Sequence, residues 1–255
     1  MHKTLEFSDA VRLIEERVAA FCEVVAAAPD LGATVPTCPD WTLFDLAQHI
    51  GQSRRFWAMN LAAGAADAPS AEAVAVKNGA APQEREALVA WIAEGARQQV
   101  AALREAGPEG ECWTWWAGSQ SPRNAGGLAR HQLQEIAMHT YDAHLTVGDP
   151  QPLPEEIAYD GADEFLHTCC STSVAWPFEP AILDYHVEDG RSWRLTLSGE
   201  GVRVSEVGPE PADLTGRASA GQLVLSYYGR VGIDALELEG DRTVLERLVH
   251  WDPSA

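Results

Sequence analysis

The chain has few basic residues: 18 lysines and arginines stand against 38 aspartates and glutamates, which gives a formal net charge of −20. A field of that sign repels phosphate backbones and anionic lipids, so it argues against nucleic-acid and membrane partners. An anionic substrate would need local arginines or a metal ion in order to bind. We therefore expect a small-molecule substrate, and the sequence leaves the oligomeric state open.

Long apolar runs and paired cysteines are also lacking. No stretch has the length and apolar character of a membrane span, and the N-terminus enters amphipathic spacing without a signal segment. The five cysteines are odd in number and show no CxxC spacing, so a disulfide framework is disfavoured and a cytoplasmic location is expected. The adjacent Cys169 and Cys170 suit buried apolar positions better than a redox pair.

Several catalytic motifs are missing from the sequence. It contains no GxSxG, HExxH, Walker or GxGxxG pattern, so serine-hydrolase, zincin and nucleotide-binding classes lack support. What it does contain is 46% hydrophobic residues over 255 positions, enough for one large or two ordinary buried cores.

The first half of the chain shows helical periodicity. Apolar residues spaced by three and four predict helices over residues 8–28, 41–63, 84–106 and 125–146. Thr42 is the expected N-cap of the second helix, and Asp45 three residues later makes a weak capping box. Four helices of this length suit an antiparallel bundle, in which facing helices can build a metal site.

The second half has a different pattern. Three prolines within residues 148–156 predict a boundary between a domain over 1–147 and another over 153–255. Period-two alternation predicts strands within 181–189, 191–199, 201–208, 212–219 and 235–238, and helices are expected over 155–172, 220–228 and 242–249. The expected fold class is therefore a four-helix bundle followed by a smaller α+β domain that contains an antiparallel sheet.

Three side chains on two of the predicted helices suggest a metal site. Glu135 and His139 are four residues apart on one helical face, and His49 lies on another helix. Two imidazoles and one carboxylate leave a tetrahedral ion with an open position, as in catalytic zinc. Such spacing also arises by chance, and a lone histidine is usually a core residue. Because burying Glu135 unpaired is costly, a divalent ion is an efficient partner for it, and His131 extends the stripe as a fourth ligand or a supporting group.

Two segments carry a family resemblance. TCPDWTLFDLAQHIG (37–51) and RHQLQEIAMHTYDAH (130–144) resemble the two signatures of the mycothiol-dependent maleylpyruvate isomerase family, a member of the DinB-like four-helix-bundle superfamily. ADLTGRASAGQLVLSYYGR (212–230) and LELEGDRTVLERL (236–248) resemble the family's C-terminal domain. Asp40 stands where glycine is usual, and Gln134 where many relatives have histidine. The resemblance implies a DinB-like bundle that holds Zn²⁺, or another divalent metal, at His49, Glu135 and His139.

The same resemblance implies a chemistry. In that family a thiol cosubstrate, mycothiol, adds as its thiolate to an electrophilic double bond, and the single bond formed can rotate before elimination restores the trans isomer. For maleylpyruvate the product is fumarylpyruvate. A metal ion that lowers the pKa of the thiol supports this nucleophilic catalysis. The implied activity is isomerisation or S-transfer on a small electrophilic substrate, with α,β-unsaturated acids among the candidates.

Neighbouring positions supply candidate helper residues. If His49 faces the site, Gln52 and Ser53 one turn later face it too, and we take both as catalytic candidates. Asp142 follows His139 by three residues and is placed to orient that ligand, although pairing with a surface arginine is an equal alternative.

Arginines and tryptophans complete the candidate list. Arg230 is a further catalytic candidate, and Arg55 and Arg217 are candidates for binding the cofactor, against the alternative that they are solvated surface residues. The tryptophans of CWTWWAGS either form an aromatic wall over the metal or, as aromatic burial favours, seal the end of the bundle; they are Trp113, Trp115 and Trp116.

Two rival functions remain open. A hydrolase would use metal-bound water and would turn over without a thiol. A non-catalytic binding protein would use the metal structurally, with a closed fourth coordination position.

Overall fold

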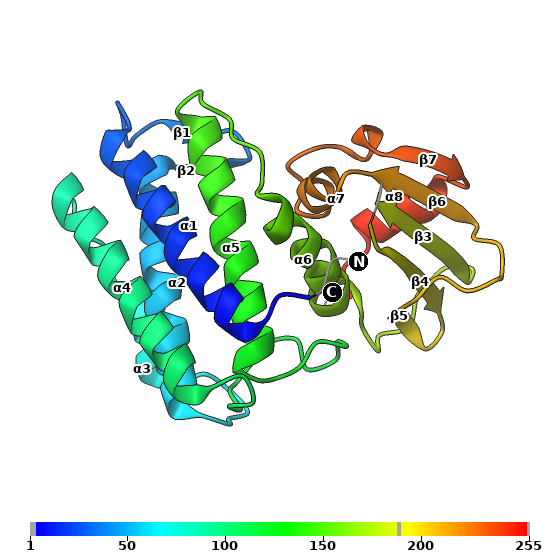
Figure 1. The fold of residues 1–255 in the computed structure, drawn as a ribbon, viewed down its shortest axis with the longest axis horizontal. Helices are drawn as coiled ribbons and strands as arrows, with labels where there is room; N and C mark the ends of the chain where they lie inside the picture. Colours follow the sequence, from blue (N-terminus) through cyan, green and yellow to red (C-terminus); the bar gives the residue numbers. More distant parts are fainter. Residues whose placement is uncertain (1–3, 188–189, 254–255) are drawn as a thin grey trace. The chain divides into compact units, whose positions relative to one another are not determined.

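The computed structural model describes residues 4–187 and 190–253, which form two compact units (Figure 1). The helical unit comprises Leu5–Trp115 and Pro122–Leu153. The sheet unit comprises Thr4, Trp116–Ser121 and the chain from Pro154 onward. The predicted fold class, helices first and a mixed α+β part second, is confirmed, whereas the boundaries 1–147 and 153–255 stay predictions.

Long helices build the helical unit. In the described residues they are α1 (Phe7–Ala27), α2 (Leu43–Ala63), α4 (Arg85–Ala106) and α5 (Ala125–Thr146). Helix α1 packs on α4 and α5, and α2 packs on α4 and also contacts α5 (Figure 1). Their apolar faces meet in a core where each fully buried aliphatic side chain contributes roughly 1.5–3 kcal/mol. Ile14, Ile50, Ile92 and Ile136 are examples, one from each helix.

Two short features were not predicted from the sequence. A small hairpin of β1 (Thr34–Val35) and β2 (Cys38–Thr42) precedes α2. A short helix, α3 (Ala71–Lys77), lies in the expected Ala/Gly/Pro-rich loop, and the Ser70 hydroxyl caps it by accepting from the Ala73 amide at 3.1 Å. A serine before an alanine-rich segment is the sequence signal for such a helix.

The start of α2 confirms the predicted capping box and corrects the helix boundary. The Thr42 hydroxyl accepts from the Asp45 amide at 3.2 Å, and the Asp45 carboxylate accepts from the Thr42 amide at 2.9 Å. Because an N-cap residue has extended backbone geometry, the residue before it lies outside the helix. Helix α2 therefore begins at Leu43, and Trp41 belongs to β2.

The sheet unit is built on a mixed sheet. Its described strands, in spatial order β5-β4-β3-β6-β7, are β3 (Ala181–Val187), β4 (Ser192–Ser198), β5 (Gly201–Ser205), β6 (Leu214–Ala218) and β7 (Glu237–Gly240). Neighbouring strands are antiparallel except β3 and β6, which are parallel. The predicted antiparallel pairing is therefore found at every described pair but this one, since alternation specifies the faces of a strand but not its direction.

Helices accompany this sheet. Helix α6 (Glu155–Phe165) continues into a π-helical turn, η1 (Leu166–Cys170), and packs on α7 (Ala220–Tyr227). A 3₁₀ turn, η2 (Ile233–Ala235), precedes β7, and α8 (Thr243–His250) contacts β3. Helices α6, α7 and α8 match the predicted helices closely, apart from the π-helical turn within 155–172, and η2 was not predicted.

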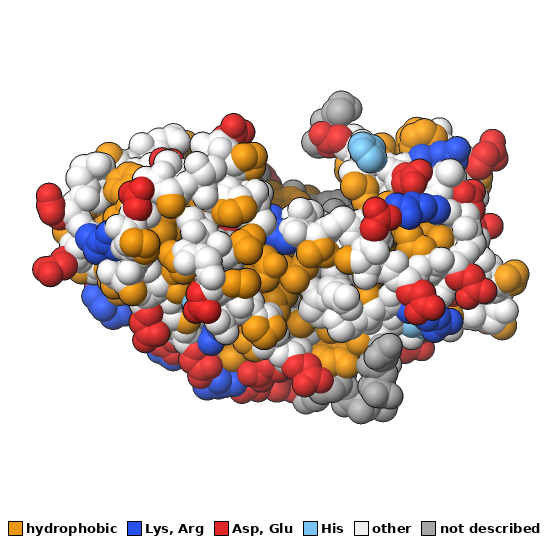
Figure 2. Space-filling model, turned by 90° about the horizontal axis from the view of Figure 1, so that it is seen from above, with side chains coloured by type: hydrophobic (Ala, Val, Ile, Leu, Met, Phe, Trp, Pro, Cys, Tyr) orange, Lys and Arg blue, Asp and Glu red, His pale blue; other side chains and the backbone are white. Residues whose placement is uncertain are grey.

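Surface charge follows the composition. Acidic side chains recur across the face drawn in Figure 2, with basic side chains interspersed among them. None of the described helices combines the length and the apolar character needed to cross a bilayer. The absence of nucleic-acid partners stays a prediction.

Candidate functional site

His49, Glu135 and His139 lie next to one another in the helical unit. The Nε2 atom of His49 is 3.2 Å from Oε1 of Glu135, and the rings of His49 and His139 have centroids 5.1 Å apart. Helix α2 supplies the first residue and α5 the other two, whose four-residue spacing places both on one helical face. The structure thus brings together the three residues that the sequence singled out.

The carboxylate of Glu135 is held from the side of α2. Ser53 Oγ lies 2.8 Å and 2.9 Å from its two oxygens, and Arg54 donates a hydrogen bond to Oε2. Burial disfavours the charged form of Glu135, but the charge of Arg54 and the hydrogen bond with His49 outweigh it and hold its pKa well below the usual range. Glu135 is therefore ionised at neutral pH and can serve as an anionic ligand.

Arg54 is the functional neighbour that sequence reasoning missed as a partner of Glu135. Its side chain is 0% exposed, and its Nη1 donates to Gln99 Oε1 at 2.9 Å and to the Gln132 carbonyl at 3.3 Å. Burial lowers its pKa, and the charge of Glu135 opposes that effect. The available signal was its position four residues after Ile50, on the apolar face of α2, where a cation requires an acidic partner.

His139 is oriented by a buried carboxylate. Its Nδ1 lies 2.9 Å from Oδ2 of Asp142, and the Thr37 hydroxyl donates to Oδ1 of the same carboxylate at 2.7 Å. Burial lowers the pKa of His139, partly offset by the hydrogen bond with Asp142, so the ring is neutral at neutral pH. A neutral ring that donates Nδ1–H to Asp142 presents the Nε2 lone pair to a metal ion. Asp142 is 0% exposed and is not a surface ion-pair residue.

An aromatic ring lies against the histidines, but it is not one of the three predicted tryptophans. The Trp41 ring centroid is 4.9 Å from that of His49 and 6.2 Å from that of His139. Its place in β2, directly before the N-cap of α2, aims it at the helix face that carries His49. Such a ring limits the access of water to one side of the cluster.

The three tryptophans of the CWTWWAGS segment, expected either to wall the metal or to seal the end of the bundle, lie in two units. Trp113 stacks on Trp57 with centroids 5.7 Å apart, which favours the packing interpretation of this segment. Trp115 is 50% exposed and meets the edge of His131 at 5.5 Å. Trp116, 2% exposed, belongs to the sheet unit.

Two helper candidates on α2 contact other parts of the helical unit. Gln52 donates from Nε2 to the Gly79 carbonyl at 2.6 Å, on the loop that follows α3. Arg55 lies over the Trp91 ring at 4.2 Å and donates to the carbonyls of Gly51 at 2.9 Å and Trp91 at 2.6 Å. These contacts hold α2 to its neighbours, and catalytic or cofactor-binding roles for the two residues stay predictions.

The remaining two candidates lie in the sheet unit. Arg217 is exposed on β6, in register with His186 of β3 and Glu237 of β7. Arg230 follows α7 and donates from Nη1 to the Tyr228 carbonyl at 2.7 Å. Their proposed roles in catalysis and cofactor binding stay predictions.

Two imidazoles and one carboxylate are suitable ligands for a divalent ion, although the side chains of His49, Glu135 and His139 do not all converge on one point. Within the described residues, no three His, Cys, Asp or Glu side chains converge as a ready metal site. Tetrahedral zinc with bonds of about 2.0–2.1 Å has ligand atoms about 3.3 Å apart. The 3.2 Å between His49 Nε2 and Glu135 Oε1 meets this spacing, and the ring centroid of His139 lies 5.1 Å from that of His49.

Comparisons with known proteins identify the family of the chain. The family model described as the mycothiol maleylpyruvate isomerase N-terminal domain matches residues 11–144, and the MDMPI C-terminal domain model of the same family matches residues 156–247. No protein with curated annotation matches the chain.

Solved structures share the fold. A crystal structure of the mycothiol-dependent maleylpyruvate isomerase is 13% identical with a TM-score of 0.57, and one of its histidine-to-alanine mutant is 14% identical with a TM-score of 0.59. Each alignment covers 92% of this chain and 93% of the other. With both family models matching in order along one continuous chain, the protein belongs to the mycothiol maleylpyruvate isomerase family.

Proposed function

We propose that the protein is a thiol-dependent isomerase that binds a divalent metal ion, most suitably zinc, at His49, Glu135 and His139. Its thiol cosubstrate would be mycothiol, and its substrate a small electrophilic acid with an α,β-unsaturated bond. The cluster of these three side chains is the observation that carries the proposal. Family membership supports the thiol and the reaction class, and the donor chemistry of the cluster supports the metal.

A metal ion at these residues would supply an open coordination position and lower the pKa of a thiol placed there. The residues around it keep the ligands in their required states. Ser53 and Arg54 fix the Glu135 carboxylate, and Asp142 fixes the tautomer of His139. In this way the chain sets the charge of Glu135 and the tautomer of His139 before any substrate arrives.

The contacts of two arginines restrict how the acid group of a substrate is bound. Arg54 is engaged by Glu135 and Gln99, and Arg55 by two backbone carbonyls. Neither guanidinium is therefore available in this arrangement to neutralise a substrate carboxylate. In a chain of net charge −20, that role requires another cation.

Metal content and thiol dependence test the proposal together. We expect the purified protein to contain about one divalent ion per chain by elemental mass spectrometry, and to convert maleylpyruvate to fumarylpyruvate only when mycothiol is added. Turnover of an acid or amide substrate without any thiol would support the hydrolase alternative instead. Thiol-dependent turnover that survives complete chelation would contradict the metal.

Asp142→Asn is expected to weaken metal affinity by about 10–100-fold, because an amide is a poorer acceptor for the Nδ1–H of His139 than a carboxylate. A competition titration against a chromophoric chelator measures this change. Asp149→Asn is the matched control, since that exposed carboxylate lies 3.9 Å from His144 and outside the cluster. Equal affinities in the two variants would show that Asp142 does not act through a metal ligand.

A further inference from the structure

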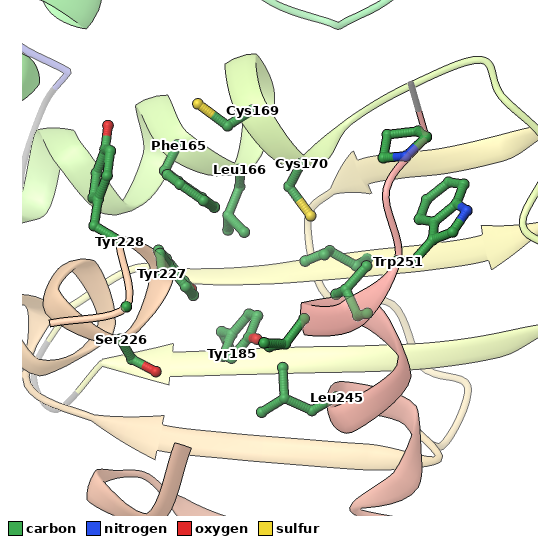
Figure 3. A pocket seen from close by; sticks show the side chains of 15 residues that line it. Phe165, Leu166, Cys169, Cys170, Tyr185, Ser226, Tyr227, Tyr228, Leu245 and Trp251 are labelled. Atoms are coloured by element: carbon green, nitrogen blue, oxygen red, sulfur yellow. The ribbon is translucent and has the colours of Figure 1, made fainter. Parts of the chain in front are cut away.

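The apolar cavity of the sheet unit does not supply the cation that an acid substrate requires. This cavity, of ≈ 430 Å³, is bounded by α6, η1, β3, α7 and the chain around α8 (Figure 3). Its described lining carries no Lys, Arg or His side chain. A carboxylate placed there would lose its hydration without gaining an opposite charge. The cation has to come from elsewhere, and the surroundings of His49 in the helical unit contain one.

Helix α5 lies along one side of the face of α2 that carries His49, which we call the His49 face. Ser53, one turn after His49, contacts both carboxylate oxygens of Glu135 on α5, at 2.8 Å and 2.9 Å. Successive residues of an α-helix are about 100° apart around its axis, so Ser53 points about 40° to the α5 side of His49. Phe56, seven residues after His49, points within about 20° of it. The His49 face therefore continues to Phe56, two turns further along α2.

The segment 77–81 lies along the other side of the His49 face. The Gln52 side chain donates to the Gly79 carbonyl at 2.6 Å, and the Gln48 side chain accepts from the Ala81 amide at 3.1 Å. Both glutamines point about 60–100° away from the histidine, in the direction opposite to the serine. The His49 face is therefore bounded by α5 on one side and by this segment on the other.

Lys77 begins this segment and lies over the far end of the His49 face. Its Nζ atom is 5.3 Å from the centroid of the Phe56 ring. The side chain is exposed and makes no hydrogen bond or ion pair within the described part of the chain. About 4.5 Å of helix rise, at 1.5 Å per residue, separates Phe56 from Ser53, the residue that contacts Glu135. The ammonium group thus lies beside the next turn of α2 after the one that contacts Glu135.

Other cations on α2 and α4 already have partners within the protein. Arg54 and Arg55 are engaged by a carboxylate and by backbone carbonyls, as described above. On α4, Arg85 donates to backbone carbonyls at the end of α1, and Arg97 pairs with a carboxylate of its own helix. The charge of Lys77 is not engaged in this way, so it is available to a ligand.

We propose that Lys77 binds the carboxylate of the acid substrate, whose unsaturated chain lies along the His49 face between α5 and the segment 77–81. The inference rests on the proposed function, since it places the reacting double bond at the cluster of His49, Glu135 and His139. Lys77 then supplies the cation that neither Arg54 nor Arg55 can supply. In a chain of net charge −20, a cation held at this place gives an acid a local attraction that the overall field does not.

Equilibrium binding of succinylpyruvate tests the proposal without turnover, because this saturated counterpart of maleylpyruvate has no double bond to accept a thiolate. We expect saturable binding to the full-length protein by isothermal titration calorimetry. Lys77→Gln removes the charge and should weaken binding about tenfold, whereas Lys77→Arg keeps the charge and most of the affinity. The dimethyl ester of the probe is neutral, so Lys77→Gln should not weaken its binding.

Arg97→Gln is the matched control. It removes one positive charge from an exposed side chain of the same unit, so the net charge of the protein changes by the same amount as in Lys77→Gln. The control should keep the wild-type affinity for succinylpyruvate. Both side chains are exposed, so neither variant should lower the melting temperature appreciably. Added salt should weaken binding to wild type more than binding to Lys77→Gln, because it screens an ion pair that only wild type forms.

Steady-state kinetics separate this inference from the proposed function. With maleylpyruvate and mycothiol, Lys77→Gln should raise KM about tenfold and leave kcat nearly unchanged, because the carboxylate is bound equally before and during the reaction. Lys77-dependent binding of succinylpyruvate in a protein without thiol-dependent turnover would overturn the thiol chemistry and keep the Lys77 assignment.

Three results would overturn the Lys77 assignment itself. They are an absence of saturable succinylpyruvate binding to wild type, equal affinities in wild type and Lys77→Gln, and an equal loss of affinity in Arg97→Gln. The last of these would show that binding responds to the net charge of the protein and not to a cation on the His49 face.

Discussion

Replacing Glu135 by alanine is expected to lower the unfolding free energy of the metal-free protein by about 3–5 kcal/mol. The reason is Arg54, whose side chain is 0% exposed and whose Nη2 donates to the Glu135 carboxylate. Without Glu135 the guanidinium remains buried with only neutral acceptors from Gln99 and Gln132. Urea unfolding followed by circular dichroism, in the presence of a chelator, measures the loss without a contribution from bound metal.

Further variants separate charge from packing. Glu135→Gln keeps an acceptor for Arg54 and should cost less than Glu135→Ala. The double variant Arg54→Met with Glu135→Ala removes both charges and should recover part of the lost stability. Glu94→Ala is a suitable control, because that carboxylate pairs with Arg97 in solvent and its removal should change stability little. The single variant Arg54→Met completes the comparison. If the stability losses of Arg54→Met and Glu135→Ala simply add in the double variant, the two side chains are not energetically coupled.

The pH dependence of this loss follows from the pKa of Glu135. That pKa is depressed in the folded protein, mainly because Arg54 and His49 overcome the effect of burial. Stability from such a carboxylate is fully present above its unfolded pKa, about 4.3, and is lost as pH falls through the folded value. The stability difference between wild type and Glu135→Ala should therefore be constant from pH 7 to about pH 5 and shrink below that.

The helices of this fold were predictable because their patterns are local. Helix α5 (Ala125–Thr146) has the boundaries that its apolar spacing predicts, and the Thr42–Asp45 capping box at α2 is as expected. The helix start at Trp41 was wrong, although an N-cap at Thr42 already excludes the residue before it. Apolar spacing and capping residues together were therefore sufficient to predict the boundaries of these helices.

Other features of the fold depend on non-local contacts. The parallel pairing of β3 with β6 joins residues about thirty apart in the chain, and period-two alternation holds no information about direction. The π-helical turn Leu166–Cys170 has no recognised sequence signal, since it inserts one residue into an otherwise helical pattern. Both required the structure.

The candidate site also contains residues that local sequence predicted and one contact that depends on the pairing of helices. Spacing within α5 and the family resemblance placed Glu135 and His139 beside His49, and the structure agrees. The roles of Ser53 and Asp142 as supports for these side chains were within reach of helical geometry. Arg54 as the partner of Glu135 was not, because the pairing of two helices decides which cation meets which carboxylate.

His139→Ala is expected to abolish stoichiometric metal binding and to reduce thiol-dependent turnover to background. The loss of a direct ligand should weaken metal affinity by more than the roughly 10–100-fold expected when an outer partner such as Asp142 is changed. Elemental mass spectrometry after dialysis measures the metal, and a coupled absorbance assay with mycothiol measures turnover. His144→Ala is the matched control on the same helix, and it should keep both metal and activity.

The same variant distinguishes a metal site from a purely hydrogen-bonded cluster. If Glu135 serves only to neutralise Arg54, then His139→Ala should change stability slightly and leave the metal content at the low level of wild type. If the three residues hold an ion, wild type should be stabilised by added Zn²⁺ by RT ln(1 + [Zn²⁺]/Kd), and His139→Ala should lose that increment while His144→Ala keeps it. A zinc-dependent rise in melting temperature that persists in His139→Ala would place the ion elsewhere in the molecule.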